Sequence, residues 1–211
     1  MTIFNDLADV LTLLLVIFLN YTNLTRIGLI SDTHHFLDEA VFEHFKDCDE
    51  IWHAGDFGSI EIAEKIIAGW NLPELLQPST INDHLSAIRQ TGQPGRKLRG
   101  VYGNIDGQDI RSVFPEQLIF MCEEIKVMMR HIGGYPPKYN PATKKEIMAH
   151  RPQLFISGHS HILKVMYDEK LCCLHMNPGA AGKQGWHKVR TIIRFVIDGS
   201  EMKNCEVIEL G

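Results

Sequence analysis

The chain has 211 residues, of which 45% are hydrophobic and 22% are charged. This composition is typical of one ordinary globular domain and excludes the disordered and fibrous classes. The formal net charge of −5 argues against a broad basic surface for sequence-independent nucleic-acid binding, although a local basic patch stays open. The five cysteines show no Cys-x-x-Cys spacing, which favours a reducing cytoplasm over a disulfide framework or a thiolate zinc site.

An almost unbroken apolar run, Val10 to Leu19, lies near the N-terminus. It is too short to span a bilayer as a helix. Asp6 and Asp9 precede it without any basic residue and no small-residue cleavage site follows, so a signal peptide or membrane anchor is the minority interpretation. We expect residues 1–24 to be an apolar extension, either packed on the domain or a partner or without a role, and residues 25–211 to be a single domain.

From Arg26 onwards, short apolar runs alternate with turns rich in Asp, His and Gly and with segments of helical period. This alternation is typical of an α/β fold. Buried strands are expected at residues 26–31, 50–54, 98–103, 125–130 and 154–158. Helices are expected at residues 37–45, after Ser59 with a stripe that reaches Trp70, and from the Asn140-Pro141 cap to His150.

After His161 the pattern changes to alternating strands without helices. Residues 165–176 and 189–210 are each expected to form a hairpin, the second turning at Asp198-Gly199. The sequence therefore predicts a mixed sheet core of two stacked sheets with helices outside. Residues 71–97 are irregular and rich in Pro and Gly around an expected helix at 81–89, so we interpret them as a surface insertion.

Polar residues of the kind that bind metal ions cluster where the predicted strands end. They lie in five blocks: SDTHH (31–35), AGDFGS (54–59), YGNIDG (102–107), RHIGG (130–134) and SGHSH (157–161). Because ligands bind outside the carboxyl ends of strands in open α/β sheets, we expect the blocks to converge on one site. Carboxylate, amide and imidazole ligands suit Mn, Fe, Zn and similar divalent ions. A carboxylate such as Asp56 can bridge two ions, and a hydroxide held between them would attack phosphorus.

In this order the five blocks resemble the signature of the calcineurin-like metallophosphoesterases, specifically the small bacterial and archaeal phosphodiesterase branch related to the retromer subunit Vps29. The resemblance runs from about Arg26 to Gly211, includes NPGAAG (177–182), and leaves out the N-terminal extension and the insertion. It implies an α/β fold, a four-layer αββα sandwich of two mixed β-sheets flanked by helices. It also implies a two-metal-dependent phosphoric ester hydrolase, with a phosphodiesterase as the preferred interpretation.

The resemblance also implies a ligand set. One metal ion is assigned to Asp32, His34, Asp56 and His161, and the other to Asp56, Asn104, His131 and His159. Asp56, Asn104 and His131 would then serve catalysis by positioning metal and phosphate, with the bridging hydroxide as nucleophile. Mn is the first choice for both ions, and Zn, Fe, Ni and Co are alternatives.

Several further residues are candidates for substrate contact or for support of the ligands: His53, Asn177 and His35. For His53 a purely structural role has equal weight, for Asn177 a role in shaping the loop beside the site is the main interpretation and phosphate contact the minority one, and the direction of the His35 side chain stays open. His175 and His187 flank the NPGAAG block, and a structural role is the main interpretation for both.

Ile105 follows Asn104 where larger phosphatases of the superfamily carry a His that can protonate the leaving group. This departure favours diesters, or esters with good leaving groups, over broad phosphomonoester hydrolysis. Two alternatives remain: a Vps29-like protein-interaction scaffold with little or no catalysis, and a phosphomonoesterase. We expect a small phosphodiester or nucleotide-like substrate and a cytoplasmic protein, with a homodimer left open and without a strong nucleic-acid or firm membrane signal.

Overall fold

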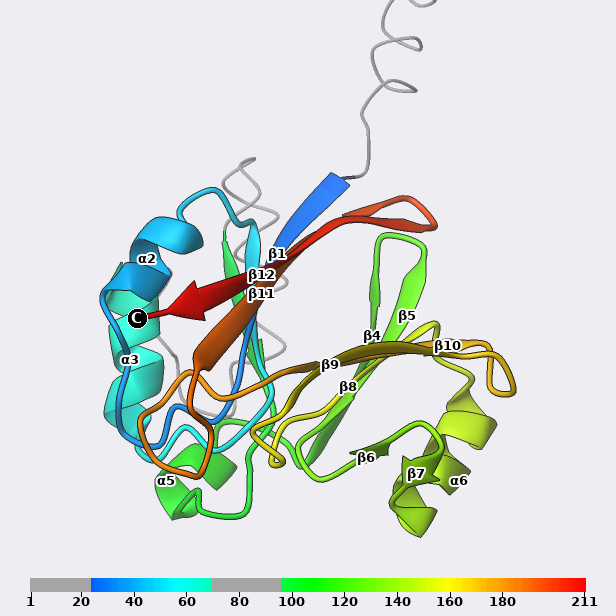
Figure 1. The fold of residues 1–211 in the computed structure, drawn as a ribbon, viewed down its shortest axis with the longest axis horizontal. Coiled ribbons are helices and arrows are strands. Elements are labelled where there is room, and N and C mark those ends of the chain that lie inside the picture. The colour runs from blue at the N-terminus through cyan, green and yellow to red at the C-terminus, as the bar shows by residue number, and fades with distance from the viewer. Residues whose placement is uncertain (1–23, 70–95) are drawn as a thin grey trace, which may run out of the picture.

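The computed structural model describes residues 24–69 and 96–211 of the chain (Figure 1). The first of its two large sheets has the strand order β12-β11-β1-β2-β3. Its strands are β1 (Leu24–Ile30), β2 (Glu50–His53), β3 (Lys97–Gly100), β11 (Arg190–Asp198) and β12 (Glu201–Leu210). The first three run parallel, and β11 and β12 add antiparallel pairings, so the sheet is mixed.

The second sheet has the strand order β4-β5-β8-β10-β9. Its strands are β4 (Gln117–Cys122), β5 (Ile125–Arg130), β8 (Leu154–Ile156), β10 (Cys173–Pro178) and β9 (Leu163–Asp168). Three parallel strands form its centre, and β4 and β9 pair antiparallel at the two edges. A small two-stranded hairpin, β6 (Gly134–Tyr135) and β7 (Lys138–Tyr139), stands apart.

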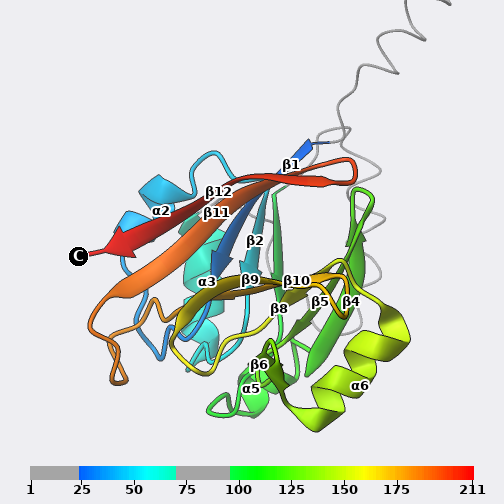
Figure 2. The ribbon, with the colours of Figure 1, turned by 45° about the vertical axis from the view of Figure 1, so that its right-hand side comes forward.

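The helices lie outside the two sheets. They are α2 (Ala40–His44), α3 (Ile60–Gly69), α5 (Gln108–Arg111) and α6 (Pro141–His150). Helices α2 and α3 cover the outer side of the first sheet, and α6 lies on the opposite side of the molecule beside the second sheet (Figures 1 and 2). Helix α6 begins as predicted, because Oδ1 of Asn140 accepts a hydrogen bond from the Ala142 amide (2.9 Å) and Pro141 occupies the first turn.

Three hydrophobic clusters separate the layers. One lies between the first sheet and α2 and α3, one between the two sheets, and one between the second sheet and α6. Strand β5 shows how the sequence produces this arrangement, since alternate side chains of a strand point to opposite faces. Val127 and Met129 enter the cluster between the sheets, whereas Met128 enters the cluster beneath α6. The predicted four-layer sandwich is therefore confirmed.

The sequence missed several elements. Strand β4 was not expected, because its turn to β5 uses Glu123 (φ +49°) and Glu124 instead of the Gly, Asn or Pro that announce a hairpin. The predicted helix at 37–45 is a short helix, Ala40–His44. The apolar run at 10–19, the helix expected at 81–89 and Trp70 lie outside the described residues, as does the insertion except for its last two residues. Within the described ranges, no helix is long and apolar enough to cross a membrane.

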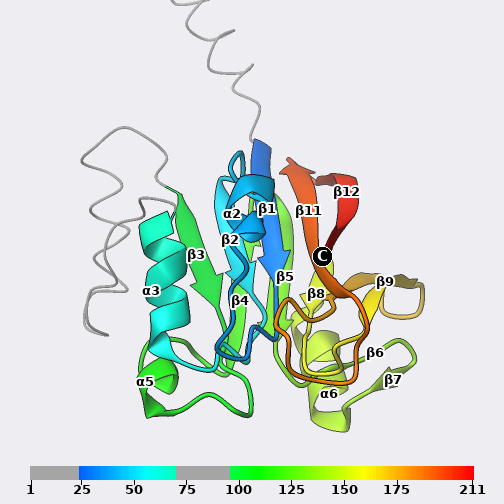
Figure 3. The same ribbon diagram turned by 60° about the vertical axis from the view of Figure 1, so that its left-hand side comes forward.

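The parallel strands bring the polar loops to one end of the molecule. Figure 3 shows β1 and β3 pointing toward the same end. Asp32, Asp56 and Asn104 follow β1, β2 and β3 of the first sheet, and His131 and His159 follow β5 and β8 of the second. The loops of both sheets therefore supply the candidate site.

Candidate metal centre

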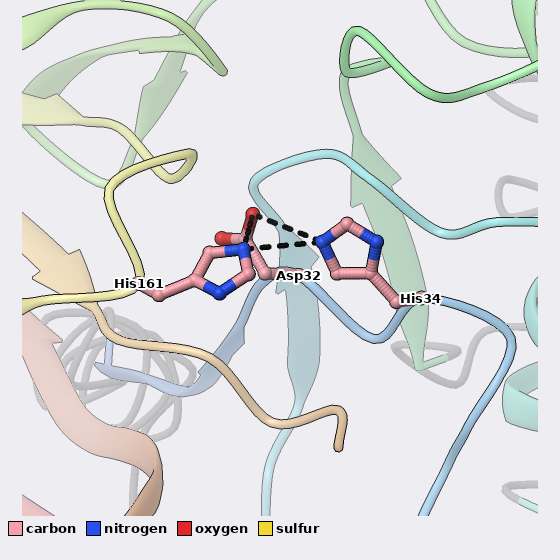
Figure 4. A group of neighbouring side chains, drawn as sticks. All are labelled: Asp32, His34 and His161. Carbon is pink, nitrogen blue, oxygen red and sulfur yellow. Dashed lines mark hydrogen bonds and ion pairs between the residues drawn. The ribbon is translucent and has the colours of Figure 1, made fainter. Parts of the chain in front are cut away.

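The first group of convergent side chains is Asp32, His34 and His161 (Figure 4). Nε2 of His161 lies 3.2 Å from Oδ1 of Asp32 and 3.1 Å from Nε2 of His34, and Nε2 of His34 lies 3.9 Å from the same carboxylate oxygen. Asp32 is fully buried, and its Oδ2 accepts a hydrogen bond from Oγ of Ser31 (2.6 Å). Its carboxylate is therefore fixed, with Oδ1 facing the two imidazoles.

The second group is Asp56, His131 and His159. Nε2 of His131 lies 3.2 Å from Oδ2 of Asp56, and both side chains are buried. On the other side of the His131 ring, Nδ1 lies 2.7 Å from the carbonyl oxygen of Ala54. A carbonyl only accepts hydrogen bonds, so Nδ1 carries the proton and Nε2 presents its lone pair to Asp56.

The two groups touch each other. The backbone amide of His159 donates to both carboxylate oxygens of Asp32 (3.2 and 3.1 Å), while its ring belongs to the second group. Nε2 of His34 in turn lies 3.6 Å from Oδ2 of Asp56. Asp56 thus approaches imidazoles of both groups, as expected of a bridging carboxylate.

The donor atoms fit divalent cations. Within each group the ligand atoms lie within 4.8 Å of one another, close to the separation of about 4.4 Å or less that metal–ligand bonds of about 2.0–2.2 Å impose. Nε2 of His131 is buried without a hydrogen-bond partner, although it faces two carboxylates. A buried imidazole lone pair of this kind normally has a partner. A bound cation would supply it.

The backbone at the site is held in an unusual conformation. Of ten described non-glycine residues with positive φ, six belong to the polar loops: Asp32, His34, His35, Asp56, His159 and His161. Such left-handed positions cost about 1–2 kcal/mol each and persist only where the surroundings enforce them. The short turns that follow the strands enforce them here, with Asp32 N bonded to Gly55 O (2.9 Å) and His34 N to Asp56 O (3.1 Å). Clustered strain of this kind is a mark of a functional site.

The electrostatics favour the metal-binding protonation states of Asp56, His34 and His159 and act in the opposite direction at His131. Burial raises the pKa of Asp56, but His131, the Ile105 amide and His34 outweigh it, so the net pKa is lowered and the carboxylate stays ionised. Burial lowers the pKa values of His34 and His159, which favours neutral rings with free lone pairs. For His131 burial also lowers the pKa, but Asp56 and Asp32 outweigh it and raise the pKa, so a cation would have to displace a proton from this ring.

Asn104 lies beside a pocket of about 440 Å³ that adjoins the second group. The pocket is lined by Tyr102, Gly103, Asn104, Arg111, Glu116, Arg130, His131, Ile132 and Asn140. The amide next to Asn104, that of Ile105, donates to Oδ1 of Asp56 (3.1 Å), which places the Asn104 loop against the second group. Space for a substituent thus lies directly beside His131.

Asp106 ties the Asn104 loop to the Asp56 loop, in line with the structural role in the Asn104 loop that its position favours. Its Oδ1 accepts from the Gly58 amide (2.8 Å) and its Oδ2 from the Gly103 amide (2.7 Å), while the side chain is buried. Arg111 adds two bonds from its guanidinium to the carbonyls of Gly103 and Asp106. An Asp two residues after the Asn was the only sequence signal.

The His53 ring is buried between the loops that carry the ligands. It is fully buried, its Nδ1 accepts from the Gly55 amide (3.2 Å) and its Nε2 faces Oγ1 of Thr33 (3.0 Å). Burial lowers the pKa of His53 to about 3, and the neutral ring stacks on Phe57. His53 therefore supports the loops that carry the ligands.

Asn177 and His35 have different surroundings. The Asn177 amide donates to Gly158 O (2.7 Å) and accepts from Gly179 N (2.9 Å), so this buried residue shapes the loop before His159. His35 donates its backbone amide to Phe57 O (3.0 Å), and its ring is exposed. Of the three candidates, His35 is thus the one whose side chain is accessible to a ligand.

Two mixed sheets packed face to face, with carboxylates and imidazoles at their strand ends, define an α/β protein with a centre suited to a pair of divalent cations. The profile of the calcineurin-like phosphoesterase superfamily domain matches residues 25–200, and the chain belongs to this family. No curated protein sequence matches the chain significantly.

Solved structures share the fold. Vps29 from Entamoeba histolytica complexed with Zn²⁺ is 14% identical, with a TM-score of 0.60 over 87% of this chain and 98% of that one. An archaeal phosphodiesterase is 19% identical, with a TM-score of 0.60 over 88% and 99% of the two chains. A predicted phosphoesterase from Streptococcus pneumoniae is 19% identical, with a TM-score of 0.55 over 88% and 90%. At these identities the likeness establishes the fold alone.

Proposed function

We propose that the protein is a two-metal-dependent phosphoesterase that prefers phosphodiesters as substrates. The observation that carries this proposal is the convergence of six carboxylate and imidazole side chains into two touching groups within a phosphoesterase family fold. The ions would be held by the residues assigned above, with Asn104 completing the second group. Mn is proposed as the first ion to test, and Zn, Fe, Ni and Co as the alternatives.

When bound, the two cations would activate a bridging water for attack on phosphorus and offset the charge of the phosphoryl oxygens. The chain's own residues prepare this arrangement. Asp56 lies within 3.6 Å of Nε2 of His34 and 3.2 Å of Nε2 of His131, which supports it as the bridge. Ala54 O holds His131 in the tautomer that leaves Nε2 free.

The preference for diesters rests on the leaving group. Ile105 is 40% exposed beside Asn104 and offers no proton to a departing alkoxide. One substituent of a diester would occupy the adjoining pocket, where Arg111 and Arg130 outnumber the single carboxylate of Glu116. A small, polar or nucleotide-like substituent suits such a lining. We also propose a cytoplasmic location.

The test is hydrolysis of bis(p-nitrophenyl) phosphate by the metal-free protein with and without added Mn²⁺. We expect Mn²⁺-dependent release of p-nitrophenol, faster than from p-nitrophenyl phosphate. Asp56→Asn should lower kcat/KM more than about 100-fold, because it changes a proposed metal ligand. Substitution of a residue that only supports a ligand typically costs about 10–100-fold in metal affinity or activity. Asp47→Asn, an exposed carboxylate between α2 and β2, is the matched control and should be unchanged. Absence of metal-dependent hydrolysis of any ester would refute the proposal.

One observation favours the second candidate, a protein-interaction scaffold. The edge strand β9 leaves its apolar side chains exposed: Leu163, Val165, Met166 and Tyr167. Metal content alone does not separate this function from catalysis, because Zn²⁺ accompanies a Vps29 structure. The hydrolysis assay separates them, since a scaffold would bind metal without turnover.

A further inference from the structure

His161 makes a second contact on the side of its ring that faces away from Asp32. Its Nδ1 lies 3.3 Å from Nδ1 of His187, and the two rings meet edge to face with centroids 5.2 Å apart. The other nitrogen of His187, Nε2, lies 2.9 Å from the carbonyl oxygen of Gly182. Both nitrogens of His187 are therefore engaged within the protein.

These contacts determine which nitrogens carry protons. The Gly182 carbonyl only accepts, so Nε2 of His187 is the protonated nitrogen, and Nδ1 of the neutral ring is an acceptor. Nδ1 of His161 must then be the donor in the contact between the two rings. Its proton leaves a lone pair on Nε2 of His161, the atom that faces Asp32 and His34.

The contacts of His187 belong to a closed chain of contacts that begins and ends at Asp32. The Gly182 amide donates to the carbonyl oxygen of Asp32 (2.9 Å), so the residue that fixes His187 is itself bonded to the backbone of the carboxylate ligand. From Asp32 the contacts run through Gly182, His187 and His161 back to Oδ1 of Asp32. Three of the four residues come from the polypeptide after β8, and the fourth follows β1 of the other sheet.

Gly185 makes the close approach feasible. Its φ of +129° is a conformation that other residues rarely adopt, and a Cβ there would lie 2.3 Å from Nδ1 of His161 and 3.0 Å from Nδ1 of His187. Any larger residue would therefore separate the two rings. The loop is shaped so that His187 reaches His161.

We propose that His187 is a positioning residue that holds His161 in the tautomer and orientation needed to bind the first metal ion. This inference rests on the proposed metal-dependent function. Partners of this kind fix the ring of a ligating histidine, and their removal typically costs about 10–100-fold in metal affinity. Neither ring nitrogen of His187 is free for a substrate, which agrees with a structural role for this residue.

The experiment compares His187→Ala with His187→Asn, whose Oδ1 can take the place of the Nδ1 acceptor. Long-range ¹H–¹⁵N NMR of the metal-free proteins, at a pH where the rings are neutral, gives the tautomer of His161. Calorimetric titration with Mn²⁺ gives the affinity. In the wild type we expect the Nδ1–H form, and in His187→Ala a mixture of tautomers and about 10–100-fold weaker binding. His187→Asn should recover most of both.

His150→Ala, which removes an exposed histidine on α6, is the control and should match the wild type. Gly185→Ala keeps the His187 side chain but blocks its approach, and should resemble His187→Ala. An unchanged tautomer in His187→Ala would overturn the proposal, as would equal losses in the Ala and Asn variants. If the wild type binds no Mn²⁺, the proposed function fails. The tautomer of His161 in the metal-free proteins still tests whether His187 positions that ring.

Discussion

Oδ2 of Asp56 lies 3.2 Å from Nε2 of His131, although the two residues follow strands of different sheets. The same holds for the first group, in which Asp32 follows β1 and His161 follows β8. Each group of ligands is thus completed only where the two sheets pack together.

Metal ions should stabilise the fold, because each would connect the two sheets. At a free Mn²⁺ concentration of about 100 times Kd, one site raises the free energy of unfolding by about 2.7 kcal/mol. For a chain of this size the midpoint of thermal unfolding should rise by about 5–10 °C. Differential scanning calorimetry with Mn²⁺ and with a chelator measures this. His131→Ala should lose the contribution of the second site, and identical midpoints of the wild type with and without metal would contradict the prediction.

Gly103→Ala should weaken metal binding through Asp56. A Cβ at Gly103 would lie 2.0 Å from Oδ1 and 2.5 Å from the amide nitrogen of Asp56, so the carboxylate must shift. We expect a loss of about 1–3 kcal/mol in stability from overpacking, and Mn²⁺ affinity at least about tenfold weaker by calorimetry. Gly107→Ala is the control in the same loop, because there a Cβ meets only the exposed Asp109 carboxylate (2.7 Å). Equal affinities of the two variants would be inconsistent with this prediction.

Asp106→Ala should destabilise the protein by about 2–4 kcal/mol, because it leaves the amides of Gly58 and Gly103 without an acceptor. Urea unfolding measures the loss. Asp47→Ala, which removes an exposed carboxylate, should change the free energy of unfolding by less than about 0.5 kcal/mol. A similar value for both variants would show that the Asp106 bonds contribute nothing.

His175 should make the stability depend on pH. Burial, with a smaller contribution from Lys164, lowers the pKa of His175 to about 4, whereas an unfolded His has a pKa of about 6.5. Between these values the unfolded chain binds a proton that the folded protein does not bind. The contribution is therefore fully present above about pH 6.5 and is lost as the pH falls toward 4, by up to about 3 kcal/mol.

His175→Gln removes this titration and retains a polar partner for Oγ of Ser157, which lies 3.0 Å from Nε2 of His175. The difference in free energy of unfolding between wild type and variant should shrink between about pH 6.5 and 4. Urea titrations at several pH values provide the comparison. Parallel stability curves would refute the role of His175.

Much of the architecture could be predicted from local pattern. The strand before His131 is a buried run with alternating faces, and Asn140-Pro141 caps a helix by chemistry within three residues. Strand β4 could not be predicted in this way, because its turn at Glu123 has no turn-forming residue and its conformation depends on pairing with β5. Tertiary pairing decided its conformation.

The candidate site was predictable in its residue types but not in its supports. The predicted strand ends indicated Asp32 and Asp56 as ligands, whereas Asp106 accepts hydrogen bonds from the backbone amides of two separate loops. Nothing in the spacing of His161 and His187 predicts that their rings meet, since the contact requires the conformation of the loop at Gly185. Sequence patterns describe neighbours along the chain, and these contacts join distant segments.

The division of the ligands between the two sheets also limits when a metal ion can bind during folding. Neither group is complete in any shorter stretch of chain, because the first needs residues 32 to 161 and the second residues 56 to 159. A nascent chain would gain no complete site until β4, β5 and β8 of the second sheet had been synthesised. Metal binding would therefore come late in folding, because it requires that the two sheets have packed together.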